Sequence, residues 1–222
     1  MKLVTFQTRQ ALTVLERQGV LAVSPDHINL QRYGIPYDYM VQQMKTHRIF
    51  PPANISYPLW AWAKYGVYMA PKKRKNLTGQ TQDRVKITFE KSAQEVLLSD
   101  YMAYSFMLSG HIVPKTHQEY YDFLNEMVKR NIPLEELKNY VRHQSTRQDV
   151  VKLFPKIQKT WKRIFDLKSN VHQACVWDIK LSEVLEVDLL EDANYRYGVV
   201  NALRANGTRP NWKKKYLKFL PD

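Results

Sequence analysis

The sequence predicts a mixed α+β domain, and three features of the chain lead to this fold class. Strand-like segments occur within the first 105 residues and again from residue 172. Between them, residues 110–165 are helical in pattern. A length of 222 residues fits one domain with an insertion. We therefore expect a single domain over residues 1–222, with a helical insertion at 110–165 packed on or beside a sheet.

The first half of the chain alternates between strand and helix signals. Residues 2–7 (KLVTFQ) alternate in polarity and predict a strand with one apolar face. Thr8 is typical of a helix N-cap, and Gly19 is typical of the residue that follows a helix. The next segments predict a helix at YDYMVQQMKTHR, a strand or extended wall at YPLWAWAKYG, a basic loop at APKKRKNLTGQTQ and a clear strand at RVKITFEK.

The second half begins with a short apolar strand, EVLLSD, and a helix that ends at Gly110. Thr116 and Glu119 match a capping box, and Pro133 suits a first helical turn. Pro155 should kink or split the last helix of the insertion. The remaining segments predict a strand at HQACVWDI, a turn with a short strand or helix at LSEVLEVDLLED, and a terminal helix at NWKKKYLKFL.

Composition excludes several functional classes. Seven glycines and the absence of GxGxxG and GxxxxGK[ST] argue against dinucleotide-binding and P-loop motifs. The single cysteine, Cys175, excludes an intrachain disulfide and a cysteine zinc cluster. No HExxH occurs, so no metal site is expected. No apolar run is long enough to span a bilayer, so we expect no membrane association and a cytoplasmic location.

The net charge of +13 is concentrated in two segments. Residues 72–91 hold seven basic and two acidic residues, and the basic C-terminal tail, residues 204–222, holds six basic and one acidic residue. Basic patches attract nucleic-acid phosphates, and they also favour anionic membranes or simple solubility. The candidate nucleic-acid contacts are Lys72, Lys73, Arg74, Lys75, Lys213, Lys214 and Lys215.

Two stretches place polar residues where a strand ends and a helix begins. Gln7 and Thr8 follow the first strand, where helix N–H groups can face an anion. The alternative is that Thr8 only caps the helix and Gln7 is an edge residue. Ser99 and Asp100 follow another strand and either border a cleft or form a turn with an N-cap.

Two further stretches carry aromatic or polar residues along one strand face. Trp60 and Trp62 share a face and could stack on a base or nicotinamide, or could pack in the core. In HQACVWDI, the side chains of Gln173, Cys175 and Trp177 alternate with those of their neighbours. The alternative interpretation is a half-buried strand.

Taken together, the stretches FQTRQALTVLERQGVL, YDYMVQQM, YPLWAW, VLLSD and HQACVWDI resemble a family of bacterial proteins described only as a domain of unknown function. The layout is also similar to the DNA-modifying toxin class of ADP-ribosyltransferases. LERQGVL, PLWAWAKY, LLSD and QACVW carry that second resemblance. It implies an ADP-ribosyltransferase-like split sheet with a helical insertion, and NAD as the substrate.

The second resemblance also implies a set of site residues. Gln7, Asp100 and Gln173 would be catalytic. Thr8 would contact the nicotinamide ribose, Tyr39 and Trp62 would form the pocket walls, Arg48 would hold a phosphate, and Ser99 would line the cleft. Gln7 stands where this class has histidine, and Cys175 stands where it has the catalytic glutamate. Asp178 and Glu183 lie near that position but do not match it.

The leading functional hypothesis is ADP-ribosyl transfer from NAD to a nucleic acid. It requires that residues 7, 62, 100 and 173 converge on one hollow. The missing glutamate and the +13 charge favour an alternative, a non-catalytic nucleic-acid-binding module of a bacterial or phage defence-related system. A third possibility is a protein-interaction domain whose tryptophan and tyrosine surface contacts a protein partner.

Overall fold

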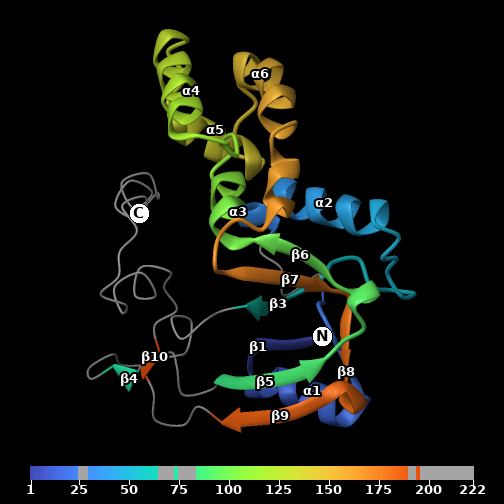
Figure 1. Ribbon diagram of the computed structural model, residues 1–222. Coiled ribbons are helices and arrows are strands. Elements are labelled where there is room, and N and C mark those ends of the chain that lie inside the picture. The colour runs from blue at the N-terminus through green and yellow to red at the C-terminus, as the bar shows by residue number, and fades with distance from the viewer. Residues whose placement is uncertain (25–29, 65–72, 75–83, 190–193, 196–222) are drawn as a thin grey trace.

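The computed structural model describes residues 1–24, 30–64, 73–74, 84–189 and 194–195. Its main sheet has six strands in the order β6-β7-β3-β1-β5-β9 (Figure 1). Every pairing in this sheet is antiparallel. The strands are β1 (Lys2–Thr8), β3 (Leu59–Lys64), β5 (Arg84–Glu90), β6 (Leu97–Asp100), β7 (His172–Val176) and β9 (Val184–Leu189).

Two short antiparallel pairs accompany the main sheet. β2 (Val20–Ala22) pairs with β8 (Asp178–Lys180), and β4 (Lys73–Arg74) pairs with β10 (Asn194–Tyr195). Part of the predicted basic loop is therefore a strand. Lys72, Lys75 and the whole tail at 204–222, including Lys213, Lys214, Lys215 and the predicted terminal helix, lie outside the described residues.

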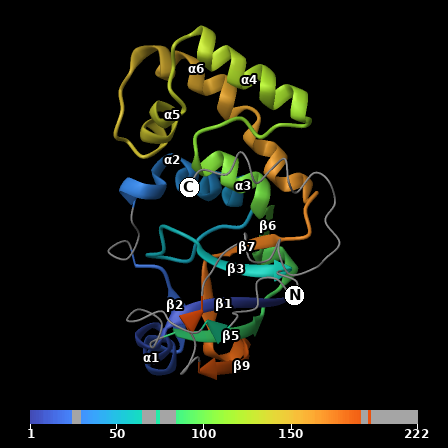
Figure 2. The same cartoon turned by 90° about the vertical axis from the view of Figure 1, so that its left-hand side faces the viewer.

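The helices are α1 (Arg9–Gln18), α2 (Leu30–Thr46), α3 (Tyr101–Leu108), α4 (His117–Lys129), α5 (Leu134–Val141) and α6 (Gln148–Gln158), with 3₁₀ helices η2 (Ala93–Glu95), η3 (Trp161–Asp166) and η4 (Leu181–Glu183). Figures 1 and 2 show α2 to α6 gathered beyond the β6–β7 side of the sheet, whereas α1 lies at the β5–β9 side. The segment predicted to be helical contains α4, α5, α6 and most of η3.

Local signals account for several helix ends. The Thr8 side chain accepts a hydrogen bond from the Ala11 N–H at 3.1 Å, and Gly19 ends α1 with φ of 72°. Both caps were predicted. The predicted split at Pro155 is wrong, because α6 continues through it and Lys159 N–H donates to the Pro155 carbonyl. Burial of Phe154 and Ile157 on either side of the proline offsets the hydrogen bond that the proline cannot donate.

The sheet separates two apolar cores. One contains Leu15 of α1 together with Ala174 and Val176. The other joins the helices to Cys175 and Trp177. The predicted alternation along HQACVWDI is therefore confirmed, as is the mixed α+β class. Within the described residues, no helix combines the length and apolar character needed to cross a bilayer.

Candidate functional site

Three residues predicted for the site lie in one row across neighbouring strands. Ser99 of β6 is directly opposite Gln173 of β7, and Gln173 is directly opposite Trp62 of β3. Directly opposite residues of antiparallel strands point to the same face. This face is the one that the helical core covers. Trp60 and Cys175, the adjacent directly opposite pair on the same face, belong to that core. We call Ser99, Gln173 and Trp62 the polar row.

The polar row contains buried groups with unmet hydrogen-bonding capacity. Ser99 is fully buried and Gln173 is 5% exposed. Within the part of the chain that the structure describes, Ser99 Oγ and Gln173 Nε2 have no hydrogen-bond partner. An unpaired buried polar atom costs about 1–3 kcal/mol, so it calls for an explanation. The Trp62 residue opposite Gln173 packs its ring against Tyr101, with ring centroids 5.1 Å apart.

Gln7 does not join the polar row, and the Thr8 side chain caps α1. Val4 is the β1 residue opposite Trp62, and Gln7 comes three residues later, so it points to the other face. Its pairing partner on β5 is Val85, in the α1 core, and its Nε2 donates to Thr5 Oγ1 at 2.8 Å. The expectation that Gln7 shares one hollow with Trp62 and Gln173 is therefore wrong.

Asp100 has a structural role at the start of α3. Its Oδ1 accepts hydrogen bonds from the N–H groups of Met102 at 2.9 Å and Ala103 at 3.1 Å. Its Oδ2 accepts a third from the Ser169 N–H. These bonds satisfy the first turn of the helix and tie it to the segment before β7. The alternative considered from the sequence, an N-cap, is thus confirmed for Asp100.

Asp100 also borders a cavity of about 180 Å³ between α3 and η3. We call it the α3–η3 cavity. Its other lining residues are Met102, Ala103, Phe106, Val113, Pro114, Arg163, Asp166, Lys168 and Ser169. Ligand pockets for drug-sized molecules measure roughly 300–1,000 Å³. The cavity therefore suits a single ring system better than an entire dinucleotide.

Arg163 is fixed at the border of this cavity. Its Nη1 donates to the Val113 carbonyl and to Glu119 Oε1, each at 2.7 Å. Burial opposes ionisation of Glu119, but hydrogen bonds from the Lys115 N–H and Arg163 outweigh it, so the pKa of Glu119 lies below its usual value. Arg163 is therefore held in place beside the cavity by an ion pair with Glu119 and a bond to the backbone.

A group of basic residues that the sequence reasoning missed lies on α6 and η3. Lys152, Lys156, Lys159 and Lys162 are exposed, and we call them the lysine face. Lys152 and Lys156 lie on the side of α6 opposite its buried residues Val150, Phe154 and Ile157, and Lys159 is the C-cap residue of the same helix. Residues 150–165 contain no Asp or Glu. Among the described residues, no ion pair involves any of these four lysines.

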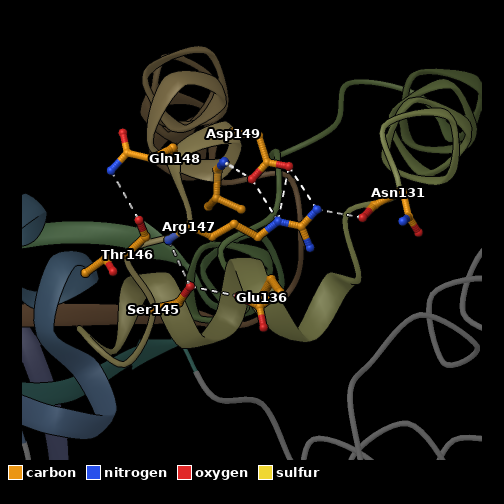
Figure 3. A network of polar contacts seen from close by, with 8 residues as sticks. Asn131, Glu136, Ser145, Thr146, Arg147, Gln148 and Asp149 are labelled. Atoms are coloured by element: carbon orange, nitrogen blue, oxygen red, sulfur yellow. Dashed lines mark hydrogen bonds and ion pairs between the residues drawn. The ribbon is translucent and has the colours of Figure 1, made fainter.

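A polar network fixes the start of α6 (Figure 3). The Arg147 guanidinium contacts both carboxylate oxygens of Asp149 and donates to the Asn131 carbonyl at 2.8 Å. The Arg147 hydrogen bond lowers the pKa of Asp149. Ser145 Oγ donates to Glu136 Oε2 at 2.8 Å, which ties the same loop to α5. The lysine face is therefore carried on a helix with an anchored first turn.

Tyr39 and Arg48 lie away from the polar row. Tyr39 packs edge-on against Trp161 in the helical core, with ring centroids 5.4 Å apart, and burial raises the pKa of Tyr39 to about 12. Arg48 follows α2 with a left-handed φ of 62°. Its N–H donates to Lys45 O, and Ile49 N–H donates to Met44 O, which is the Schellman arrangement. Neither residue lines the α3–η3 cavity.

Arg48 instead borders a second cavity of about 220 Å³, whose lining includes Lys91 and Asp178. Lys91 Nζ lies 2.6 Å from Asp178 Oδ1 and 2.9 Å from both carboxylate oxygens of Glu183. Burial alone would lower the pKa of Lys91, but these two carboxylates raise it above its usual value. The carboxylates nearest to Cys175 in sequence therefore neutralise a buried lysine.

No cluster of three or more potential metal-ligating side chains occurs in the described ranges.

The comparisons with known proteins give one match. The family model described as "Domain of unknown function (DUF3841)" matches residues 2–185. This match covers most of the chain, so the protein belongs to that family, and the predicted resemblance to a domain of unknown function is confirmed. Neither the curated proteins nor the solved structures gave a match.

Proposed function

We propose that this member of the DUF3841 family binds nucleic acid through the lysine face. The observation that carries the proposal is the set of four exposed lysines without ion-pair partners among the described residues, on a segment without acidic residues. Each lysine that neutralises a phosphate releases condensed counterions, which favours binding at low salt. The net charge of +13 adds long-range attraction for a polyanion.

The geometry of α6 suits contact with successive phosphates. A helix rises 1.5 Å per residue, so Lys152 and Lys156 are about 6 Å apart along the axis, and Lys159 lies about 4.5 Å further. Because Val150, Phe154 and Ile157 are buried, the opposite face is held toward solvent. Such contacts position a backbone without reading its sequence.

The test compares two variants that carry the same change in charge. In the first, the four lysines of the lysine face are replaced by glutamine. In the matched control, four exposed lysines elsewhere are replaced by glutamine: Lys2, Lys45, Lys115 and Lys129. Affinity for a single-stranded oligonucleotide is measured over a range of salt concentrations by fluorescence anisotropy.

Each phosphate contact contributes roughly 0.7 to the slope of log K against log salt for single strands. In the lysine-face variant the magnitude of this slope should therefore fall by up to about 3. The control variant should keep most of the slope of the unaltered protein. Equal reductions in both variants would show that only overall charge matters, which would contradict a defined interface. Absence of binding by the unaltered protein would overturn the proposal.

The polar row favours a second candidate function, ADP-ribosyl transfer from NAD to a nucleic acid. Gln173 Nε2 and Ser99 Oγ would hydrogen-bond the nicotinamide amide or its ribose, and Trp62 would stack on the ring. In this reaction the bond between nicotinamide and ribose C1′ breaks, nicotinamide leaves, and a nucleophile of the acceptor forms the new bond. The proposed relation to the ADP-ribosyltransferase fold belongs to the same hypothesis.

This second function is tested with labelled NAD and oligonucleotides. The expected result is label on the oligonucleotide with the unaltered protein, and a loss of at least tenfold in Gln173→Ala. Gln7→Ala serves as a control, because Gln7 lies on the other face and should leave transfer unchanged. If no label is transferred, the polar row has no transferase role, whereas nucleic-acid binding by the lysine face is unaffected.

A further inference from the structure

We infer that the α3–η3 cavity receives one unstacked base of a single strand whose phosphates lie along the lysine face. This inference rests on the proposed nucleic-acid binding and specifies its ligand. A paired base lies inside a duplex and cannot enter a cavity, so the preferred ligand is single-stranded.

The size of the cavity fits one base. An apolar cavity of about 150 Å³ holds a benzene ring in another protein. The α3–η3 cavity, at about 180 Å³, has room for a ring of somewhat larger size. It is too small for a dinucleotide, which separates this role from NAD binding at the polar row.

The cavity lining has two chemical characters. Apolar surface comes from α3 and from the segment after it: Met102, Ala103, Phe106, Val113 and Pro114. Apolar and aromatic side chains pack against the faces of bases regardless of sequence. The polar part of the lining includes two ion-paired cations and the carboxylates of Asp100 and Asp166. Arg163 pairs with Glu119 at 2.7 Å, and Lys168 pairs with Asp166 at 3.7 Å. The Lys168 side chain is 67% exposed, so its ammonium group can also reach a phosphate that flanks a base in the cavity.

Asp100 supplies a polar contact inside the cavity. The residue is 3% exposed, and its carboxylate already accepts three backbone N–H bonds. An ionised carboxylate has about four lone-pair sites, so one acceptor position is left. An exocyclic amino group or a ring N–H of a base can donate to it. Asp100 thus contributes both to the cap of α3 and to recognition of a hydrogen-bond donor.

The chain connects the lysine face directly to the cavity. Lys162 belongs to the lysine face, and the next residue, Arg163, lines the cavity. Leu167 lies between two lining residues, Asp166 and Lys168, and has a left-handed φ of 47°. A bulky residue in this conformation is strained by about 1–2 kcal/mol, and such strain concentrates at functional sites. The geometry therefore places the base at the η3 end of the phosphate path.

The inference is tested by narrowing the cavity. Ala103→Leu extends a larger side chain from α3 into the cavity, and Ala53→Leu makes the same change at an exposed position that does not line it. We expect the unaltered protein to bind a single-stranded oligonucleotide at least fivefold more tightly than its duplex at the same salt. Ala103→Leu should remove that preference while keeping the slope of log K against log salt. Ala53→Leu should behave like the unaltered protein.

A second measurement needs no variant. A single strand built of abasic sugar-phosphate units offers the phosphates without bases. The unaltered protein should bind it with the same salt slope but at least fivefold more weakly. Equal affinity for the abasic and normal strands, or for single strand and duplex, would overturn the base-binding inference while leaving lysine-face binding in place. If no probe binds, both proposals fail.

Discussion

Acidification should destabilise the fold through His111, and the structure sets the size of the effect. His111 is 6% exposed, and its Nδ1 lies 3.0 Å from the buried Tyr120 hydroxyl. Burial, with a smaller contribution from the charge of Lys138, lowers the pKa of His111 from 6.5 to about 4. One pKa unit corresponds to about 1.4 kcal/mol, so the shift is equivalent to about 3 kcal/mol of unfolding free energy.

The direction of the effect follows from proton uptake. The unfolded chain binds a proton at His111 below pH 6.5, whereas the folded chain does so only near pH 4. The stabilisation is therefore complete above pH 6.5 and is lost progressively as the pH falls toward 4. Below pH 4 both states are protonated, and this contribution stops changing.

The assay is urea unfolding at pH 7, 6, 5 and 4 for the unaltered protein and for His111→Gln. Glutamine cannot titrate, and it keeps a polar group near the Tyr120 hydroxyl. The difference in unfolding free energy between the two proteins should shrink by about 3 kcal/mol from pH 7 to pH 4. Two parallel pH profiles would refute the assignment of His111 as a buried neutral group.

Three substitutions test other local assignments, each by urea denaturation. Asp100→Ala removes the acceptor of three backbone N–H groups and should lower the unfolding free energy by about 2 kcal/mol; an unchanged value would contradict the capping role. Arg48→Gly relieves a left-handed backbone conformation and should raise the unfolding free energy by about 1 kcal/mol. A decrease would show that the arginine side chain stabilises the fold. Ser99→Ala removes a buried hydroxyl with no partner among the described residues and should be neutral or stabilising by about 1 kcal/mol, so a clear loss would mean that the hydroxyl is paired.

Features that depend on local sequence were predictable. The Thr8 cap and the Gly19 end of α1 follow from the conformational preferences of single residues. The alternation of Cys175 and Trp177 with their neighbours follows from the period of a strand. Ser99 and Gln173 each lie in a strand that the sequence identifies, but their pairing across β6 and β7 was expected only from the resemblance to ADP-ribosyltransferases.

Features that depend on strand pairing were not predictable. Gln7 faces away from Trp62 because Val4 is the residue in register with that tryptophan, and no local signal fixes this register. The third hydrogen bond of Asp100 comes from Ser169, which is 69 residues away. Pairing of Lys91 with Asp178 likewise joins distant segments.

The lysine face, in contrast, has a signal in the sequence. Lysines at positions 152, 156, 159 and 162 recur every three or four residues, which is the spacing of one helical face. No acidic residue interrupts them.

The most direct test of nucleic-acid binding by this protein is the salt dependence of single-strand affinity in the lysine-face variant. If Lys152, Lys156, Lys159 and Lys162 contact phosphates, replacing all four by glutamine reduces the magnitude of the slope of log K against log salt by about 3. Replacing the four control lysines by glutamine leaves most of the slope unchanged. A plot that keeps its original steepness would contradict the assignment of this face as the interface.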